Sequence, residues 1–214
     1  MNFIDDKLEE FCVKYSSDSI GIIGQEIKER TLKSSELPQM LSGEMENSFL
    51  GFLIRISNPK VLVEFGTFTG YATASMAMNS AVDAVVYTMD KEGKHNKANQ
   101  SDWKKAGIQQ KIQFFQADAL VKMYELPKKW DFVFIDADKE NYPQYLEFAI
   151  TKLSENGIVA VDNALWSGKV LQSEKDGETQ AIFDTIEMAK CNPNLYVTLL
   201  PIRDGILLVQ KRSH

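Results

Sequence analysis

Acidic side chains accompany each of the five apolar segments that alternate with helical stretches in this sequence. They are Glu64, Asp90, Asp118, Asp136 and Asp162. If the segments are parallel strands, their carboxyl ends meet at one edge of a sheet, where open α/β sheets bind ligands. A single acid in such a position commonly caps the following helix. Five carboxylates at one edge repel one another, so the set predicts a metal ion or a cationic ligand between them.

The loop after the first segment, Gly66-Thr67-Phe68-Thr69-Gly70, is similar to a nucleotide-binding loop but is not a G-x-G-x-x-G sequence. Glu64 precedes it, and a carboxylate there disfavours the pyrophosphate of NAD or FAD. It suits a nucleoside that carries an ammonium group and a sulfonium. Asp90 lies 24 positions beyond Gly66, where a strand-end carboxylate accepts both ribose hydroxyls. Together these residues indicate S-adenosylmethionine rather than a redox dinucleotide.

A second group combines Asp136 and Lys139 with Asp162-Asn163, one segment later. Two carboxylates and an amide oxygen are the hard oxygen ligands that Mg²⁺ prefers. Asp-Asn is common in turns, but an acid at the preceding strand end favours a metal site. Lys139 lies at a predicted helix start, which is a poor position for a cation. That misfit favours a functional role for Lys139.

The elements that must position these residues follow from the apolar pattern. A chain of 214 residues, 44% of them hydrophobic and 25% charged, is long enough for one α/β domain with a full core. Short apolar runs separated by helical stretches predict a parallel sheet covered on both faces. We expect its strands at 61–65, 85–90, 112–115, 131–136 and 158–162.

The two ends of the chain depart from this pattern. The connection between 195–200 and 206–210 is too short for a crossover helix, so these strands are predicted to be antiparallel. At the other end, apolar residues at helical spacing predict a helical cap over residues 1–42, and a further helix is expected at 44–57. The whole chain is therefore expected to be a single domain with its core in 43–214.

Composition excludes several classes of protein. There are 24 Lys and Arg against 30 Asp and Glu, a net charge of −6, which argues against a protein that tracks nucleic-acid phosphates. Cys12 and Cys191 lack a C-x-x-C spacing, so neither a zinc site nor a disulfide framework is expected. We find no signal peptide and no apolar run near the ~20 residues that span a bilayer. We expect a cytoplasmic protein that does not contact membranes.

Four stretches carry a resemblance to a known family: 63–71 (VEFGTFTGY), 136–142 (DADKENY), 161–168 (VDNALWSG) and 200–205 (LPIRDG). They align without large gaps from about Met40 to Lys211. Together they resemble the class I S-adenosylmethionine-dependent, metal-dependent O-methyltransferases of the caffeoyl-CoA/catechol type, in their bacterial branch. The resemblance implies a Rossmann-like methyltransferase fold with a seven-stranded, mostly parallel sheet, an antiparallel C-terminal strand, helices on both faces and an N-terminal helical cap.

The resemblance also implies roles for residues by their position. The implied cofactor contacts are Glu64, Gly66, Thr67, Phe68, Gly70, Tyr71, Asp90, Asp118, Ala119, Asp136 and Asp138. The implied metal ligands are Asp136, Asp162 and Asn163, with Mg²⁺ the most suitable ion, and Lys139 matches the lysine assigned as general base. One departure is Ala72, where the family has a serine that helps to hold the cofactor's carboxylate.

The acceptor pocket is expected to contain Met40, Tyr142 and Trp166. The two aromatic residues are candidates because each lies near the metal motif; packing in the core or in an interface is the alternative for both. The helix before the first strand departs from the family, which has an acid followed by Glu-Gly-Gln-Phe-Leu where this chain has residues 45–50 (MENSFL). This change alters the floor of the expected pocket.

The implied function is transfer of the methyl group of S-adenosylmethionine to a hydroxyl of a metal-chelated catechol-like or hydroxycinnamoyl-type small molecule, by a homodimer. The alternative is a tRNA hydroxyuridine O-methyltransferase. It would need a basic patch, for which the candidates are Lys104, Lys105, Lys111, Lys128 and Lys129. A non-enzymatic binding protein on the same fold would have lost its catalytic groups, whereas the metal triad and Lys139 are intact.

Overall fold

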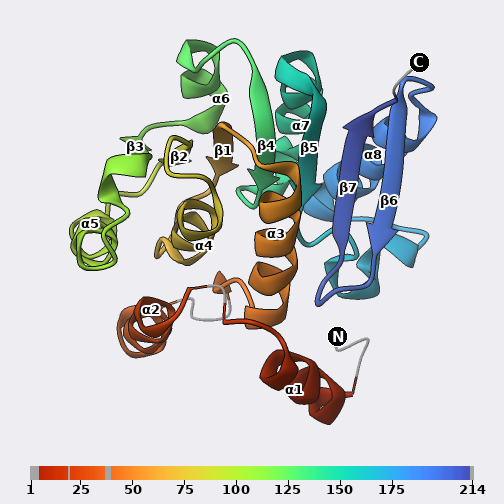
Figure 1. The fold of residues 1–214 in the computed structure, drawn as a ribbon. Coiled ribbons are helices and arrows are strands. Elements are labelled where there is room, and N and C mark those ends of the chain that lie inside the picture. The colour runs from red at the N-terminus through yellow and green to blue at the C-terminus, as the bar shows by residue number, and fades with distance from the viewer. Residues whose placement is uncertain (1–4, 19, 37–39, 213–214) are drawn as a thin grey trace.

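The computed structural model describes residues 5–18, 20–36 and 40–212, and within these residues seven strands form one sheet (Figure 1). The strands are β1 (Val61–Phe65), β2 (Val85–Asp90), β3 (Ile112–Gln116), β4 (Trp130–Ile135), β5 (Leu153–Val161), β6 (Leu195–Leu200) and β7 (Ile206–Lys211). Their order across the sheet is β3-β2-β1-β4-β5-β7-β6. Strands β1 to β5 pair in parallel, and β7 runs antiparallel to both β5 and β6. The predicted fold class is confirmed.

Helices cover both faces of this sheet (Figure 1). One face packs against α2 (Ile22–Ser34), α3 (Glu44–Ser57), α4 (Tyr71–Asn79) and α5 (Asn96–Lys105). The other face packs against α6 (Ala119–Lys122), α7 (Tyr142–Lys152) and α8 (Gly177–Cys191). In β1, Leu62 contributes to the first core and Val63 to the second, and both are fully buried. Burial on both faces explains why the central strands are continuous apolar runs.

Helix α3 has the bounds that its apolar stripe predicts. Leu50 and Ile54 are fully buried on its inner face, and Glu46, one turn earlier on the same face, is fully buried as well. The helix ends at Asn58, whose φ of 47° is the left-handed conformation that asparagine tolerates at a helix end. A carboxylate on the buried stripe of a helix is unusual, and its partner is described below.

Several short elements were not predicted because they have no apolar period. They are α6 and the 3₁₀ turns η2 (Gln109–Lys111), η3 (Met123–Glu125), η4 (Lys139–Asn141) and η5 (Trp166–Leu171). Strand β5 also begins earlier than expected, since Leu153 pairs with Trp130 before a shift in register to Ile158 opposite Phe132. Because residues 154–156 are polar, the apolar pattern did not predict this part of the strand.

The N-terminal helices lie at the edge of the sheet where the parallel strands end. In Figure 1 the arrowhead of β6 points to the lower side of the sheet; α1 (Asp6–Tyr15) lies below it, near the β6–β7 hairpin, and α2 lies at the lower left, below α4 and α5. Helix α1 contacts α3, and α2 contacts α4 and α5. Among the described residues no helix is both long and apolar enough to cross a membrane.

Candidate active site

A cavity of about 740 Å³ opens at this edge and contains most of the predicted site residues. Those that line it are Met40, Gly66, Phe68, Asp90, Ala119, Asp136, Asp138, Lys139, Asp162, Asn163 and Trp166. Those placed behind or beside its wall are Glu64, Thr67, Gly70, Tyr71, Asp118 and Tyr142. The ends of β1, β2, β4 and β5 thus meet at one cavity; of the five acids expected there, Asp90, Asp136 and Asp162 line it and Glu64 and Asp118 do not.

Gly66 joins the two predicted motifs in space. Its φ is +95°, a conformation that favours glycine, and a Cβ atom there would overlap the backbone carbonyl oxygen of Asp136. The loop after β1 therefore lies directly against the end of β4. This close crossing places the proposed cofactor loop and the proposed metal motif in one cavity.

Asp90, the last residue of β2, organises the same loop. Its Oδ2 accepts hydrogen bonds from the backbone N–H groups of Phe68, at 2.7 Å, and Thr67, at 3.2 Å, while Oδ1 accepts from Glu92 N at 2.8 Å. The carboxylate thus holds Phe68 in its left-handed conformation, φ 45°. Oδ2 is thus fully used by the loop, while Oδ1 has a further lone pair for a ligand hydroxyl.

Glu64 lies inside β1, fully buried behind the cavity wall. Its Oε2 accepts hydrogen bonds from Thr73 Oγ1 of α4 and from Thr88 Oγ1 of β2, the latter at 2.5 Å, and its Oε1 has no partner among the described residues. Burial raises the pKa of Glu64 to about 8; the two threonine hydroxyls lower it, and the nearby Asp136 and Asp90 raise it. Thr88 is the cross-strand neighbour of Glu64, so this contact could have been predicted only from the register of β1 and β2.

The end of the cavity near Ala119 contains a further tyrosine that the sequence did not predict. Tyr145 of α7 lines the cavity, and its hydroxyl donates a 2.7 Å hydrogen bond to Asp138 Oδ1. Lys91 Nζ lies 3.4 Å from Asp118 Oδ2 and 3.9 Å from Asp138 Oδ2. Asp118 caps α6 by accepting from Leu120 N. Its helix-capping role is therefore realised.

Asp136, Asp162 and Asn163 line the other end of the cavity, beyond the ends of β4 and β5. Burial raises the pKa of Asp162 well above its usual value, and the neighbouring Glu46 and Asp136 raise it further, while Lys139 lowers it. Over residues 5–18, 20–36 and 40–212 no three His, Cys, Asp or Glu side chains gather closely enough to hold a metal by themselves. The amide of Asn163 completes the candidate donor set, and crowded carboxylates are what a hard divalent cation would relieve.

Lys139 begins η4 and turns back over these carboxylates. Its Nζ lies 3.0 Å from Asp136 Oδ1 and 2.6 Å from the hydroxyl of Tyr142, and 5.8 Å from the centre of the Trp166 ring. Burial alone lowers the pKa of Lys139, but Tyr142, Asp136 and Asp162 together raise it above its usual value. Tyr142 is fully buried beneath the lysine, so the structure places it as a support for Lys139 and not in the cavity wall.

The sequence did not predict the ion pair between Glu46 and Arg203. Arg203 Nη1 lies 2.9 Å from Glu46 Oε2, and Arg203 lines the same cavity from the β6–β7 hairpin. Burial raises the pKa of Glu46 and Asp136 adds to the rise, whereas Arg203 opposes it. The detectable signal was a glutamate in register with Leu50 and Ile54 on the apolar stripe of α3.

Comparison with known proteins gives the family. A sequence model of the O-methyltransferase family matches residues 14–212. The chain belongs to the O-methyltransferase family. A flavonoid 3',5'-methyltransferase of Vitis vinifera is 32% identical over 78% of this chain and 76% of its own length. A probable caffeoyl-CoA O-methyltransferase of Dictyostelium discoideum is 31% identical over 91% of this chain and 88% of its own.

Solved structures of other proteins agree with this O-methyltransferase fold. The SAH-bound Podospora anserina methyltransferase PaMTH1 superposes with a TM-score of 0.88 at 24% identity, over 97% of this chain and 95% of its own. The O-methyltransferase TomG of Streptomyces achromogenes, in complex with SAM, gives a TM-score of 0.87 at 21% identity, over 96% of this chain and 95% of its own. The predicted family and fold are confirmed.

The wall beside the metal motif is built from an unusual backbone. Asn163, Trp166 and Ser167 have φ values of 56°, 44° and 53°, in the left-handed region that L residues rarely adopt. The turn is held because Ser167 N donates to Asp204 Oδ1 at 2.5 Å. The buried Nε1 of Trp166 has no hydrogen-bond partner among the described residues. Strained residues of this kind concentrate at functional sites, which fits a role for Trp166 in this O-methyltransferase.

Proposed function

We propose that this member of the O-methyltransferase family transfers the methyl group of S-adenosylmethionine to one hydroxyl of a catechol-like or hydroxycinnamoyl-type small molecule. The proposal depends chiefly on one observation: Asp90, Asp136, Asp162, Asn163 and Lys139 line one cavity. The similarity of this chain to a flavonoid methyltransferase and to a probable caffeoyl-CoA O-methyltransferase supports a phenolic acceptor.

The charges of the cavity suit this cofactor. S-adenosylmethionine carries a sulfonium and an ammonium group, and acidic side chains outnumber basic ones among the residues that line the cavity. The acids are Asp90, Glu92, Asp136, Asp138, Asp162, Glu178 and Asp204, and the bases are Lys91, Lys139 and Arg203. Asp90 Oδ1 has a free lone pair for a ribose hydroxyl, and Ala119 and Tyr145 form the wall beside it. We assign the adenosine to this end and the sulfonium to the end near Asp136.

We further propose that Asp136, Asp162 and Asn163 hold a divalent ion, with Mg²⁺ the best match to three oxygen donors. Such an ion would supply Lewis-acid chemistry, in that it would orient an acceptor hydroxyl and lower the pKa of a phenol, which is ~10 in isolation. Glu46 lies behind this set and adds to its negative charge. The side chains present therefore fit the ion in number, hardness and charge.

The transfer itself needs an aligned oxygen nucleophile. The acceptor oxygen gives up its proton and forms a bond to the methyl carbon as the carbon–sulfur bond breaks, and that electron pair stays on sulfur, which becomes a neutral thioether. Lys139 is placed to assist because its Nζ lies among Asp136, Tyr142 and Trp166. As a free amine it would take the proton, and as an ammonium it would stabilise the phenolate.

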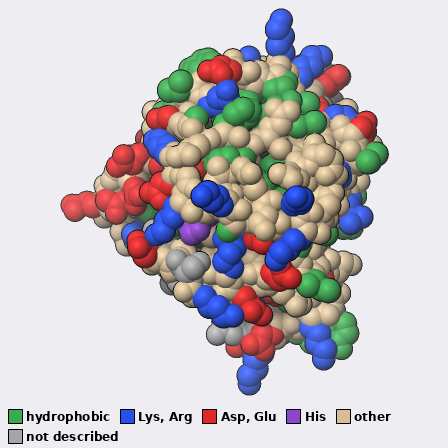
Figure 2. Space-filling model, turned by 90° about the vertical axis from the view of Figure 1, so that its left-hand side faces the viewer, with side chains coloured by type: hydrophobic (Ala, Val, Ile, Leu, Met, Phe, Trp, Pro, Cys, Tyr) green, Lys and Arg blue, Asp and Glu red, His purple; other side chains and the backbone are tan. Residues whose placement is uncertain are grey.

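The positions of the candidate lysines argue against the tRNA alternative. Lys111 precedes β3, and Lys128 and Lys129 precede β4, so these three lysines lie at the amino edge of the sheet, opposite the cavity, while Lys104 and Lys105 end α5 beside α2. Lys105 Nζ pairs with Glu26 at 3.0 Å, and Lys111 Nζ donates to two backbone carbonyls. Figure 2 shows acidic and basic side chains interspersed over the face that contains β3 and α5.

A labelled-methyl transfer assay tests the proposal. The purified protein is offered caffeic acid, a flavonoid catechol and bulk unmodified tRNA, each with Mg²⁺ and with EDTA. We expect transfer to a catechol that EDTA abolishes. Transfer to tRNA alone would replace the proposed acceptor, and transfer that EDTA leaves intact would remove the metal.

Three further predictions belong to this proposal: one domain with a cap over 1–42, a homodimer and a cytoplasmic location. Light scattering after size exclusion tests the second, since a mass of one 24.2 kDa chain would contradict it.

A further inference from the structure

Arg203 occupies a strained position that holds its side chain over the cavity edge. It lies between β6 and β7 with a φ of 50°, a left-handed conformation that L residues rarely adopt. The side chain crosses to the start of α3, where Gly43 makes room for it. A Cβ atom at Gly43 would lie 2.5 Å from Arg203 Cδ. Glu46 then fixes the guanidinium from below.

Only part of the guanidinium is occupied by the protein. Its Nη1 donates to Glu46 Oε2 at 2.9 Å and to Leu41 O at 3.3 Å. Nε and Nη2 have no acceptor in the described part of the chain, and a third of the side chain, 33%, is exposed. Planar guanidinium N–H groups of this kind match the two oxygens of a carboxylate.

Arg203 differs in this respect from the other basic side chains of the cavity. Lys139 is paired with Asp136 and Tyr142, and Lys91 lies beside Asp118 and Asp138 at the adenosine end. Among the lysines and arginines that line the 740 Å³ cavity in the described residues, Arg203 thus has donors to spare beside the metal motif.

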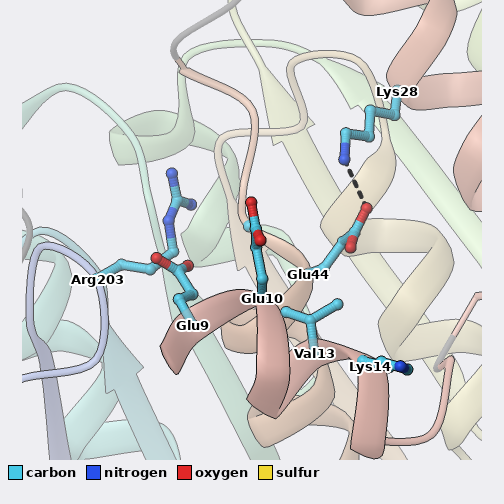
Figure 3. A pocket seen from close by; sticks show the side chains of 8 residues that line it. Glu9, Glu10, Val13, Lys14, Lys28, Glu44 and Arg203 are labelled. Atoms are coloured by element: carbon cyan, nitrogen blue, oxygen red, sulfur yellow. Dashed lines mark hydrogen bonds and ion pairs between the residues drawn. The ribbon is translucent and has the colours of Figure 1, made fainter. Parts of the chain in front are cut away.

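A smaller cavity of about 210 Å³ connects Arg203 to the cofactor loop. Leu41, Ser42 and Arg203 line both cavities, and the smaller one ends at Tyr71, the first residue of α4. Helix α4 has neither a side-chain cap nor an acidic residue in its first turn, so its first N–H groups remain free for an anion. Figure 3 shows the outer side of Arg203, where Glu9 and Glu10 of α1 line a further pocket and disfavour an anion. Lys28 and Glu44 line both this pocket and the smaller cavity, and they pair with each other at 2.6 Å, so Lys28 offsets the charge of Glu44 there.

We propose that Arg203 binds the carboxylate of the methionine part of S-adenosylmethionine, together with the N–H groups at the start of α4. This inference rests on the proposed use of that cofactor. With adenosine at Asp90 and Ala119 and sulfonium near Asp136, the amino-acid tail extends towards Tyr71, with its ammonium on the side of Glu64 and its carboxylate at Arg203. Glu46 is then a positioning residue, which holds the guanidinium and contacts no ligand.

Calorimetric binding of two ligands tests this assignment without turnover: S-adenosylhomocysteine and its analogue that lacks only the carboxylate. We expect the wild type to bind the first about 10- to 100-fold more tightly, as a charged hydrogen-bonded pair contributes. Arg203→Gln should bring this ratio close to one. Arg212→Gln, the same change near the amino edge of the sheet, should leave it as in wild type.

The double variant Glu46→Gln/Arg203→Gln guards against misfolding, since it leaves no unpaired buried carboxylate at position 46, and it should show the same lost ratio. A wild-type ratio near one overturns the inference even if no variant folds. A ratio that persists in the folded variants, or that Lys28→Gln removes instead, also overturns it. Wild-type protein that binds neither ligand would refute the proposed cofactor as well, so the two failures are distinguishable.

Discussion

The two ends of the cavity hold their carboxyl groups in different ways. At the proposed cofactor loop, Glu64 and Asp90 are held by neutral donors: two threonine hydroxyls and three backbone N–H groups. At the proposed metal motif, Asp136 and Glu46 are held by the cations Lys139 and Arg203. Neutral donors orient a carboxyl group without offsetting its charge, so that Glu64, with a pKa of about 8, can ionise when a cation binds; Lys139 and Arg203 instead offset the charge of their carboxylates beforehand. The first end thus suits a cationic cofactor. At the second end the chain's own cations already neutralise part of the carboxylate charge before a ligand binds.

The largest effect is expected at the cation-balanced end. Asp162→Ala should reduce methyl transfer at least about 10³-fold, because loss of a metal site forfeits several kcal/mol of transition-state stabilisation. The residual rate should no longer depend on EDTA. The measurement is turnover with a catechol, with and without Mg²⁺. Asp184→Ala, an exposed change on α8, is the control, and retained metal dependence in Asp162→Ala would contradict the assignment.

Lys139→Ala should lower turnover about 10²- to 10³-fold while cofactor affinity stays as in wild type. The reason is that Lys139 lies against Asp136 and Tyr142 at the acceptor end. Single-turnover rates and calorimetric cofactor binding check the two statements, with the exposed Lys190→Ala as control. Lost cofactor binding would contradict this assignment and place Lys139 with the residues that hold the cofactor.

Lys139→Arg separates the two roles open to this lysine. Arginine keeps a positive charge at all accessible pH values and cannot take a proton. Activity retained in Lys139→Arg but lost in Lys139→Ala supports stabilisation of the phenolate. Equal loss in both variants supports a base.

Glu64→Gln should weaken cofactor binding about 10-fold yet stabilise the ligand-free fold at high pH. The pKa of Glu64 is about 8 in the fold against an ordinary 4.5, so the folded state binds this proton more tightly than the unfolded chain. Wild-type stability should therefore fall as pH rises from 4.5 to 8, by about 4 kcal/mol, and the variant should lack this decrease. Urea denaturation at several pH values measures it; identical pH profiles would contradict the buried carboxyl.

Thr73→Val should have the smallest effect, on the pH dependence of cofactor binding. A cationic cofactor favours the ionised form of Glu64, so wild-type affinity should increase as pH approaches 8. Removal of the Thr73 hydroxyl raises the pKa of Glu64, and the increase should move to higher pH. Thr185→Val, an equally buried threonine in α8, is the matched control. An unchanged midpoint would show that the threonine hydroxyl does not control the pKa of Glu64.

Patterns along the chain predicted the sheet and the edge where the site lies, because buried parallel strands are continuous apolar runs that end in chemistry-bearing residues. They did not predict how those residues are held. Tyr142 was expected in the pocket wall, but its ring fits beneath Lys139, a matter of side-chain packing that spacing does not encode. Glu46 and Arg203 are 157 positions apart, and only the finished fold brings them together.

The crossing of Gly66 over the carbonyl of Asp136 limits how this protein can be re-engineered. Backbone is in contact with backbone there, so the loop cannot be widened without displacing Asp136, a proposed metal ligand. Room for donors with alkyl groups longer than methyl must come from the outer wall, where Met40 is 53% exposed and Trp166 lines the opening. Substitutions at these two positions are the route to larger donors; those in the glycine loop are not.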